Sequence, residues 1–145
     1  MKSDSIKQLS SESLDEPVSG QSATWLLVVK ALFGLLAFDL LNLDNNFGKL
    51  HRYVSKWPVS PRGTNDVNEI CKAIAYAGVL YPKRLRCLQR SAVMTCLLRS
   101  HGVRARMVMG AQSLPFRAHA WTEVDGHAVN ERRNVQKIYR VLESC

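Results

Sequence analysis

The chain of 145 residues contains few cysteines, and their spacing argues against two common kinds of small domain. Four cysteines are too few for a disulfide scaffold, and no two of them form a CxxC pair, so we expect no structural zinc site. The sequence also lacks an internal period, which excludes repeat architectures. Its hydrophobic content of 46% can fill one core. We therefore expect one domain with free thiols, typical of the reducing cytoplasm.

Acidic residues are scarce in the middle of the chain. Residues 51–117 contain twelve basic and two acidic residues, a net charge of +10, whereas the whole chain carries +8. A basic surface of this kind increases solubility, or it binds an acidic partner or nucleic acid. Because the arginines follow no single helical stripe and no nucleic-acid-binding motif is present, we do not expect nucleic acid to bind.

The N-terminal part divides into a polar segment and an apolar one. Residues 1–22 have little to bury and predict a disordered tail, followed by one domain over 23–145. Trp25–Leu43 is about long enough to span a bilayer. Lys30 and Asp39 argue against a membrane span, because they lie on opposite sides of a helix and cannot pair there. We expect a buried core helix, with one face open to a partner, and disfavour membrane contact.

The next segments predict two more helices. Residues 50–59 are mixed in character, so His51 is expected in a loop-like region, and prolines extend that loop to Gly63. A helix capped by Thr64 or Asn65 then runs to about Gly78, before Pro82 breaks the chain. The last helix covers 87–100, and Gly102 provides the signal that terminates it. Its expected apolar face is formed by Leu88, Ala92, Cys96 and Leu97.

After Gly102 the hydrophobic period changes to that of strands. Strands are predicted at 103–109, 118–124, 127–132 and 135–142, with a loop at 110–115. Asp125-Gly126 is a strong signal for a tight hairpin turn. The order indicates an α+β fold, with N-terminal helices over 23–101 packed on a C-terminal antiparallel sheet over 103–145.

Cys87 is the cysteine best placed for chemistry. It begins a helix, where the macrodipole favours an anion, and Arg84, Arg86 and Arg90 lie close by in sequence. The alternative is a buried structural cysteine, which we expect for Cys71 and Cys96. Cys87 is therefore the candidate nucleophile.

His119, in the run PFRAHAW, is the candidate base. A catalytic imidazole needs a third group to orient it, and the returning strand offers Asn130 or Glu131. A two-residue hairpin loop places Asn130 on the face of His119 and Trp121, whereas a three-residue loop places Glu131 there. Residue spacing alone leaves both registers open.

These residues belong to a longer signature. The segment from Cys87 to Glu131 resembles the lasso-peptide biosynthesis B2 proteins, leader peptidases with a transglutaminase-like, papain-like cysteine protease fold. The shared pattern is C-L-x-R-S, L-L-R-x-x-G and P-F-x-A-H-A-W-x-E-x-x-G, followed by an Asn and, in the family, an Asp. Here that Asp is replaced by Glu131, which is one methylene longer.

The resemblance implies a site and a reaction. It implies Cys87 as nucleophile, His119 as base and Glu131 as the orienting acid, with the three-residue register that Glu131 requires and Asn130 as the alternative. Arg90, Phe116, Trp121 and Asn130 are expected to shape the site, although Trp121 fits a core role equally well. Neither a metal nor another cofactor is expected.

The resemblance also implies partners. They are a lasso precursor peptide, a separate B1 leader-recognition protein and a macrolactam cyclase, since the residues before Cys87 show no leader-recognition domain. Two alternatives remain open at this point: another transglutaminase-like amidase or acyltransferase, and a non-catalytic binding module.

Overall fold

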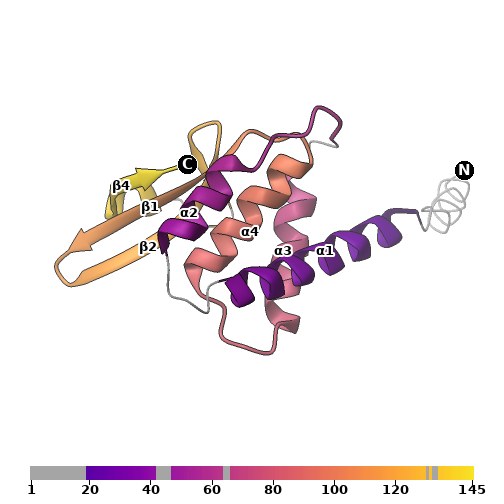
Figure 1. The fold of residues 1–145 in the computed structure, drawn as a ribbon, viewed down its shortest axis with the longest axis horizontal. Helices are drawn as coiled ribbons and strands as arrows, with labels where there is room; N and C mark the ends of the chain where they lie inside the picture. The colour runs from indigo at the N-terminus through magenta and orange to yellow at the C-terminus, as the bar shows by residue number, and fades with distance from the viewer. Residues whose placement is uncertain (1–18, 42–46, 64–65, 130, 132–133) are drawn as a thin grey trace, which may run out of the picture.

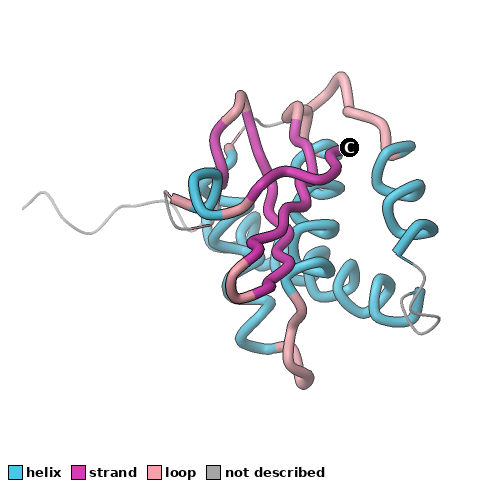
Figure 2. Tube along the Cα trace, turned by 90° about the vertical axis from the view of Figure 1, so that its left-hand side faces the viewer, coloured by secondary structure: helices cyan, strands magenta, loops and turns pink. Residues whose placement is uncertain are grey.

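A computed structural model of the chain describes residues 19–41, 47–63, 66–129, 131 and 134–145, and shows helices followed by a sheet (Figures 1 and 2). The elements, in chain order, are α1 (Ser19–Leu41), α2 (Phe47–Lys56), α3 (Val67–Leu80), α4 (Cys87–Ser100), β1 (Ala105–Ser113), β2 (Phe116–Val124), β3 (His127–Val129), α5 (Val135–Ile138) and β4 (Arg140–Ser144). The four strands form one antiparallel sheet in the order β3-β2-β1-β4. The predicted α+β class is confirmed.

Local signals explain where α3 and α4 begin and end. Asp66 caps α3 by accepting a hydrogen bond from the Glu69 backbone N–H at 3.1 Å, and the helix ends just before Pro82. The expected caps, Thr64 and Asn65, lie outside the described residues. Helix α4 has the predicted bounds, and Gly102 follows its end with a φ of +79°.

The expectation of a loop-like region around His51 is wrong, because residues 47–56 form α2. Only Leu50 and Val54 of this short helix are buried, four residues apart on one face. The rest of the helix is polar or aromatic. Two apolar positions one turn apart are too few to distinguish a short helix from a mixed loop by period alone.

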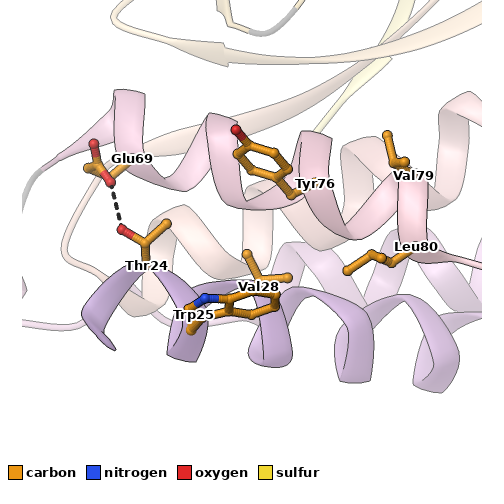
Figure 3. Close-up of a pocket in the computed structure, with 7 residues that line it drawn as sticks. All are labelled: Thr24, Trp25, Val28, Glu69, Tyr76, Val79 and Leu80. Carbon is orange, nitrogen blue, oxygen red and sulfur yellow. Dashed lines mark hydrogen bonds between the residues drawn. The ribbon is translucent and has the colours of Figure 1, made fainter. Parts of the chain in front are cut away.

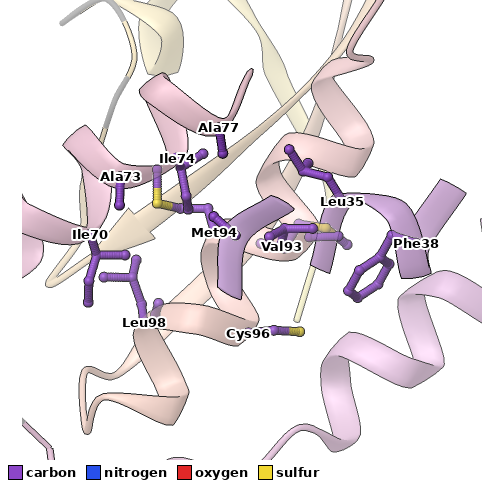
Figure 4. Close-up of a cluster of buried hydrophobic side chains, with 14 of the residues drawn as sticks. Leu35, Phe38, Ile70, Ala73, Ile74, Ala77, Val93, Met94, Cys96 and Leu98 are labelled. Atoms are coloured by element: carbon purple, nitrogen blue, oxygen red, sulfur yellow. The ribbon is translucent and has the colours of Figure 1, made fainter. Parts of the chain in front are cut away.

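Helix α4 lies at the centre of the molecule. Its residues 91–96 are all buried, because α1 and α3 cover one side and the sheet covers the other. Figure 4 shows Leu35 of α1, Ile74 of α3 and Met94 of α4 meeting in this core. The predicted single apolar face is therefore wrong: a helix that is enclosed all round needs no polar face.

Helix α1 packs on this core through one face. Val28, Ala31, Leu35 and Phe38 are buried, whereas Phe33 on another face is 73% exposed. The expected core helix is thus only half covered. The stretch Thr24–Leu41 is also long and apolar enough to cross a membrane by length and composition.

The sheet has an open edge beside β2. Strand β3 pairs only with residues 122–124, so the described residues of β3 leave the first half of β2 without a neighbour on that side. On its other side β2 pairs with β1 over its full length. The opposite edge of β1 pairs with β4. The C-terminal prediction of one strand over 135–142 is wrong, since α5 comes first and β4 starts at Arg140. The predicted loop at 110–115 is shorter, because β1 continues to Ser113.

Candidate active site

Polar side chains join α4 to β2 and fix how the two elements lie. The Ser91 hydroxyl donates to the Ala120 carbonyl at 2.9 Å, and the Thr122 hydroxyl donates to the Ser91 carbonyl at 3.1 Å. Thr95 and Thr122 meet through their hydroxyls at 3.2 Å. These buried groups satisfy one another, which explains why polar residues occur on the enclosed helix.

Cys87 is the first residue of α4, and its thiol is free and half-buried. One turn of α4, from Ser91 to Thr95, advances along β2 from Ala120 to Thr122. Cys87 lies one helical turn before Ser91. The backbone N–H groups of this first turn have no partner within the helix itself, which favours an anion there.

His119 is paired with Glu131. Its Nε2 lies 3.2 Å from the Glu131 Oε1, and both side chains are about a quarter exposed. The hairpin nevertheless has the two-residue register, with Val124 opposite His127 and left-handed φ angles at Asp125 and Gly126. The three-residue register expected for Glu131 is wrong. Asn130, the alternative partner, lies outside the described residues.

The position at which β3 ends explains how Glu131 contacts His119 although the hairpin has the two-residue register. Strand alternation predicts the face of a residue only while the strand continues, and β3 ends at Val129. Glu131 lies in the bend that follows. It can therefore meet His119 although the register alone assigns it to the other face.

A small cleft lies between Glu131 and α4. Arg90, Ser91 and Met94 line it from the helix, and Trp121, Thr122, Val129 and Glu131 line it from the sheet and the bend. Glu131 thus borders α4, whereas the ring of His119 packs with Trp121 and Tyr139. Strand alternation places these rings on the other side of β2 from Thr122, whose side chain meets α4. No hydrogen bond joins Cys87 to His119 within the described part of the chain, and the Nε2 contact leaves Nδ1 as the nitrogen available to a thiol.

Of the remaining predicted site residues, Trp121 lies at the site and Phe116 does not. Trp121 is fully buried and stacks on His119, with ring centroids 6.3 Å apart, so it serves both as a core side chain and as a neighbour of the imidazole. Arg90 is half-buried in the small cleft. Phe116 is 76% exposed at the start of β2.

Sequence reasoning missed Tyr139. Its ring centroid lies 5.3 Å from that of His119 and 6.3 Å from that of Trp121. Tyr139 stands between α5 and β4, twenty positions after His119, and no local pattern marks it. Tyr139 comes near His119 only because β4 pairs with β1, and a local sequence pattern does not predict this pairing.

The other three cysteines have environments that keep them protonated. Burial raises the pKa of Cys96 to about 12, with Arg99 acting weakly in the opposite direction. Burial also raises the pKa of Cys71 and of Cys145. A buried thiol is a poor nucleophile because the thiolate is the reactive form.

A larger apolar groove lies away from this site, between α1 and α3 (Figure 3). It has a volume of about 610 Å³. Trp25 and Val28 of α1 line it together with Tyr76, Val79 and Leu80 of α3, and a hydrogen bond from Thr24 to Glu69, 3.2 Å long, lies at one end. In the described ranges no group of three or more His, Cys, Asp and Glu side chains is arranged to hold a metal ion.

Comparison with known proteins gives two matches. The family model of the Transglutaminase-like superfamily matches residues 36–144. The chain is also similar to the microcin J25-processing protein McjB of Escherichia coli, with 28% identity over 81 residues. The match covers 54% of this chain and 39% of McjB, so this chain spans well under two thirds of the relative's length. No solved structure matches.

Proposed function

Since the chain belongs to the transglutaminase-like superfamily, we propose that it is a cysteine peptidase that removes the leader peptide from a lasso peptide precursor. The observation that carries the proposal is the His119–Glu131 pair, 3.2 Å apart, in a chain whose free Cys87 begins α4. The similarity to a microcin-processing protein supports the choice of substrate.

In the first half of the proposed reaction Cys87 is the nucleophile. Its sulfur attacks the carbonyl carbon at the junction of leader and core, while His119 takes the thiol proton on Nδ1, because Nε2 is engaged by Glu131. The backbone N–H of Cys87, at the start of α4, is the candidate donor to the oxyanion. The proposal requires the thiol and the imidazole to come within hydrogen-bond distance of each other when substrate binds.

In the second half the same groups release both products. The protonated His119 gives its proton to the departing amine of the core peptide, which leaves a thioester between the leader and Cys87. His119 then takes a proton from water, which attacks the thioester, and the thiol is regenerated as the leader acid departs. Glu131 holds the ring throughout. Thiol proteolysis of this kind needs neither metal nor nucleotide.

The proposed function includes two protein partners. A separate B1 protein would bind the leader and present the cleavage site, and an ATP-dependent cyclase would use the freed core amine to form the macrolactam. We assign the peptidase to residues 23–145 and place it in the cytoplasm, where its four free cysteines would stay reduced.

The decisive experiment measures leader release from the precursor in the presence of a B1 protein. The wild-type chain should cleave the precursor, and Cys87→Ala should lower the single-turnover rate at least a thousandfold, since the nucleophile is lost. Cys71→Ala is the matched control, because Cys71 is also half-buried on a helix, and it should cleave normally. Cleavage by Cys87→Ala at the wild-type rate would overturn the proposal.

Two further readouts separate the alternatives. An amidase or acyltransferase would lose its activity with the same substitution but would leave the precursor intact in the wild type. In a non-catalytic binding module, no cysteine would react with a thiol reagent markedly faster than the others. In the peptidase, iodoacetamide near neutral pH should label Cys87 well before Cys71 and Cys96, whose pKa values burial raises, as peptide mass spectrometry would detect.

A further inference from the structure

The His119 ring is enclosed by two other rings. Trp121 is nearly parallel to it, at an interplanar angle of 23°, and Tyr139 is inclined by 34° at 5.3 Å. Trp121 and Tyr139 also contact each other, with centroids 6.3 Å apart. The imidazole is thus held by two aromatic neighbours and by the Glu131 carboxylate.

Gly110 makes the space in which these rings meet. It pairs with His119 across β1 and β2 and with Val141 across β1 and β4. A Cβ atom at this position would lie 2.8 Å from Cη2 of Trp121 and 2.9 Å from Cβ of Tyr139. The Arg140 carbonyl oxygen lies 2.9 Å from the same position, so any side chain here would displace the start of β4 or one of the two rings that contact His119.

The sheet brings Tyr139 to this place through an irregularity. The β1–β4 register shifts between Met109 and Gly110, and β4 begins at Arg140, opposite Ala111, so that the preceding Tyr139 lies near Gly110 and His119. Tyr139 ends α5, and its backbone N–H donates to the Val135 carbonyl at 3.1 Å. Its position is therefore fixed from both sides.

Trp121 is fixed by a second set of contacts. Its Nε1 donates to the Glu123 carboxylate at 2.9 Å, and Gln136 of α5 donates to the same oxygen at 2.7 Å. Arg106 donates to the other Glu123 oxygen at 3.2 Å. The α5–β4 segment thus holds both rings, Tyr139 directly and Trp121 through Gln136 and Glu123.

We propose that Tyr139, seated over Gly110, is a positioning residue that holds the His119 imidazole in the plane required for proton transfer. The contact uses the face of the tyrosine ring, and no described hydrogen bond involves its hydroxyl. The inference rests on the proposed function, because it assumes that His119 is the base. A packed ring on one face and a carboxylate on Nε2 restrict the rotation of the imidazole, and Nδ1 is the ring nitrogen that Glu131 does not engage.

Peptidase kinetics with three variants at position 139 test this role. Tyr139→Phe keeps the ring and should cleave within about twofold of the wild type. Tyr139→Leu keeps much of the volume but loses the ring, and should lower kcat roughly tenfold or more with KM nearly unchanged, because proton transfer and not leader binding is impaired. Gly110→Ala should lower kcat in the same way. Tyr53→Leu, at an exposed tyrosine of α2, is the control and should have no effect.

An NMR measurement keeps this test independent of the proposed function. Two adjacent aromatic rings shift the His119 Hε1 resonance, which His119→Gln would identify. Tyr139→Leu should move this resonance and Tyr139→Phe should leave it in place. If the wild type fails to cleave but the resonance behaves as described, the proposed function fails and the positioning contact stands. A resonance and a kcat that Tyr139→Leu leaves unchanged would overturn the positioning role.

Discussion

At the scale of residues, the candidate site depends on a carboxylate that replaces the family's usual Asp. Glu131 is longer by one methylene, and it reaches the His119 Nε2 from a bend and not from a strand. A bend can place the longer side chain where a continuing strand could not, since the strand would fix the face of each residue. The substitution is therefore compatible with the arrangement of a triad.

The carboxylate at position 131 can be tested directly. Glu131→Gln should lower the rate of leader release by on the order of a hundredfold or more, because the amide stabilises the imidazolium poorly and can select the wrong tautomer. Glu131→Asp should retain more activity than Glu131→Gln. Single-turnover cleavage measures both. Glu143→Gln, at an exposed carboxylate of β4, is the control, and a Gln variant as active as wild type would remove Glu131 from the mechanism.

At the scale of elements, one buried arginine connects three segments around the end of α4. The Arg99 guanidinium donates to the carbonyls of Val54 and Trp57, at the end of α2, and to that of Ala105, at the start of β1. Its own backbone carbonyl accepts from the Ser60 N–H at 2.8 Å. The loop after α2 and the first strand are thereby fixed to the central helix.

Removing this arginine should destabilise the whole domain. Arg99→Met keeps much of the side-chain volume but leaves buried carbonyls without donors, and should lower the free energy of unfolding by about 2–4 kcal/mol. Urea denaturation measures the change. Arg104→Met, at an exposed arginine nearby, should change the stability by less than about 0.5 kcal/mol. Equal stabilities of the two variants would contradict the role assigned to Arg99.

At the scale of the whole molecule, the exposed apolar surface is distributed unevenly. The sheet side contains the candidate site, whereas α1 and α3 expose an apolar face and the groove between them. This face is the surface that the sequence offered for a partner, and we propose it as the docking face for the B1 protein. The two functions would then occupy different sides of the molecule.

A charge on the exposed face of α1 should prevent that docking. Phe33→Glu places a carboxylate at a side chain that is 73% exposed, so the fold should tolerate it while an apolar interface should not. Binding of purified B1 would be measured by calorimetry, with circular dichroism to check the fold. Lys56→Glu on α2 is the control and should bind normally. Wild-type affinity in Phe33→Glu would exclude this face.

The whole molecule should also lose stability in acid. Burial alone raises the pKa of Glu123, but hydrogen bonds from Gln136, Trp121 and Arg106 lower it and prevail. A lowered folded-state pKa stabilises the fold above the ordinary value near 4.5, and this stability is lost as the pH falls through the folded-state value. The Tm of the wild type should therefore drop below about pH 4.5, and that of Glu123→Gln, which keeps an acceptor oxygen, should drop less. Parallel Tm curves would contradict the assignment.

The sequence by itself determined the fold class, the central helix from Cys87 to Ser100 and the tight turn at Asp125-Gly126, because these depend on period, capping and turn chemistry within a few residues. The resemblance to a transglutaminase-like fold is confirmed by the family model. The roles of Cys87, His119 and Glu131 stay predictions.

Only the tertiary structure decided which groups surround His119. The register rule excluded Glu131 in a two-residue hairpin, yet the early end of β3 lets Glu131 reach the ring. The pairing of β4 with β1 brings Tyr139 next to His119. Helix α4 is buried on all sides over residues 91–96, whereas the sequence predicted a single apolar face. Where a strand ends and what covers a helix depend on contacts between residues far apart in the chain, and local propensity does not contain them.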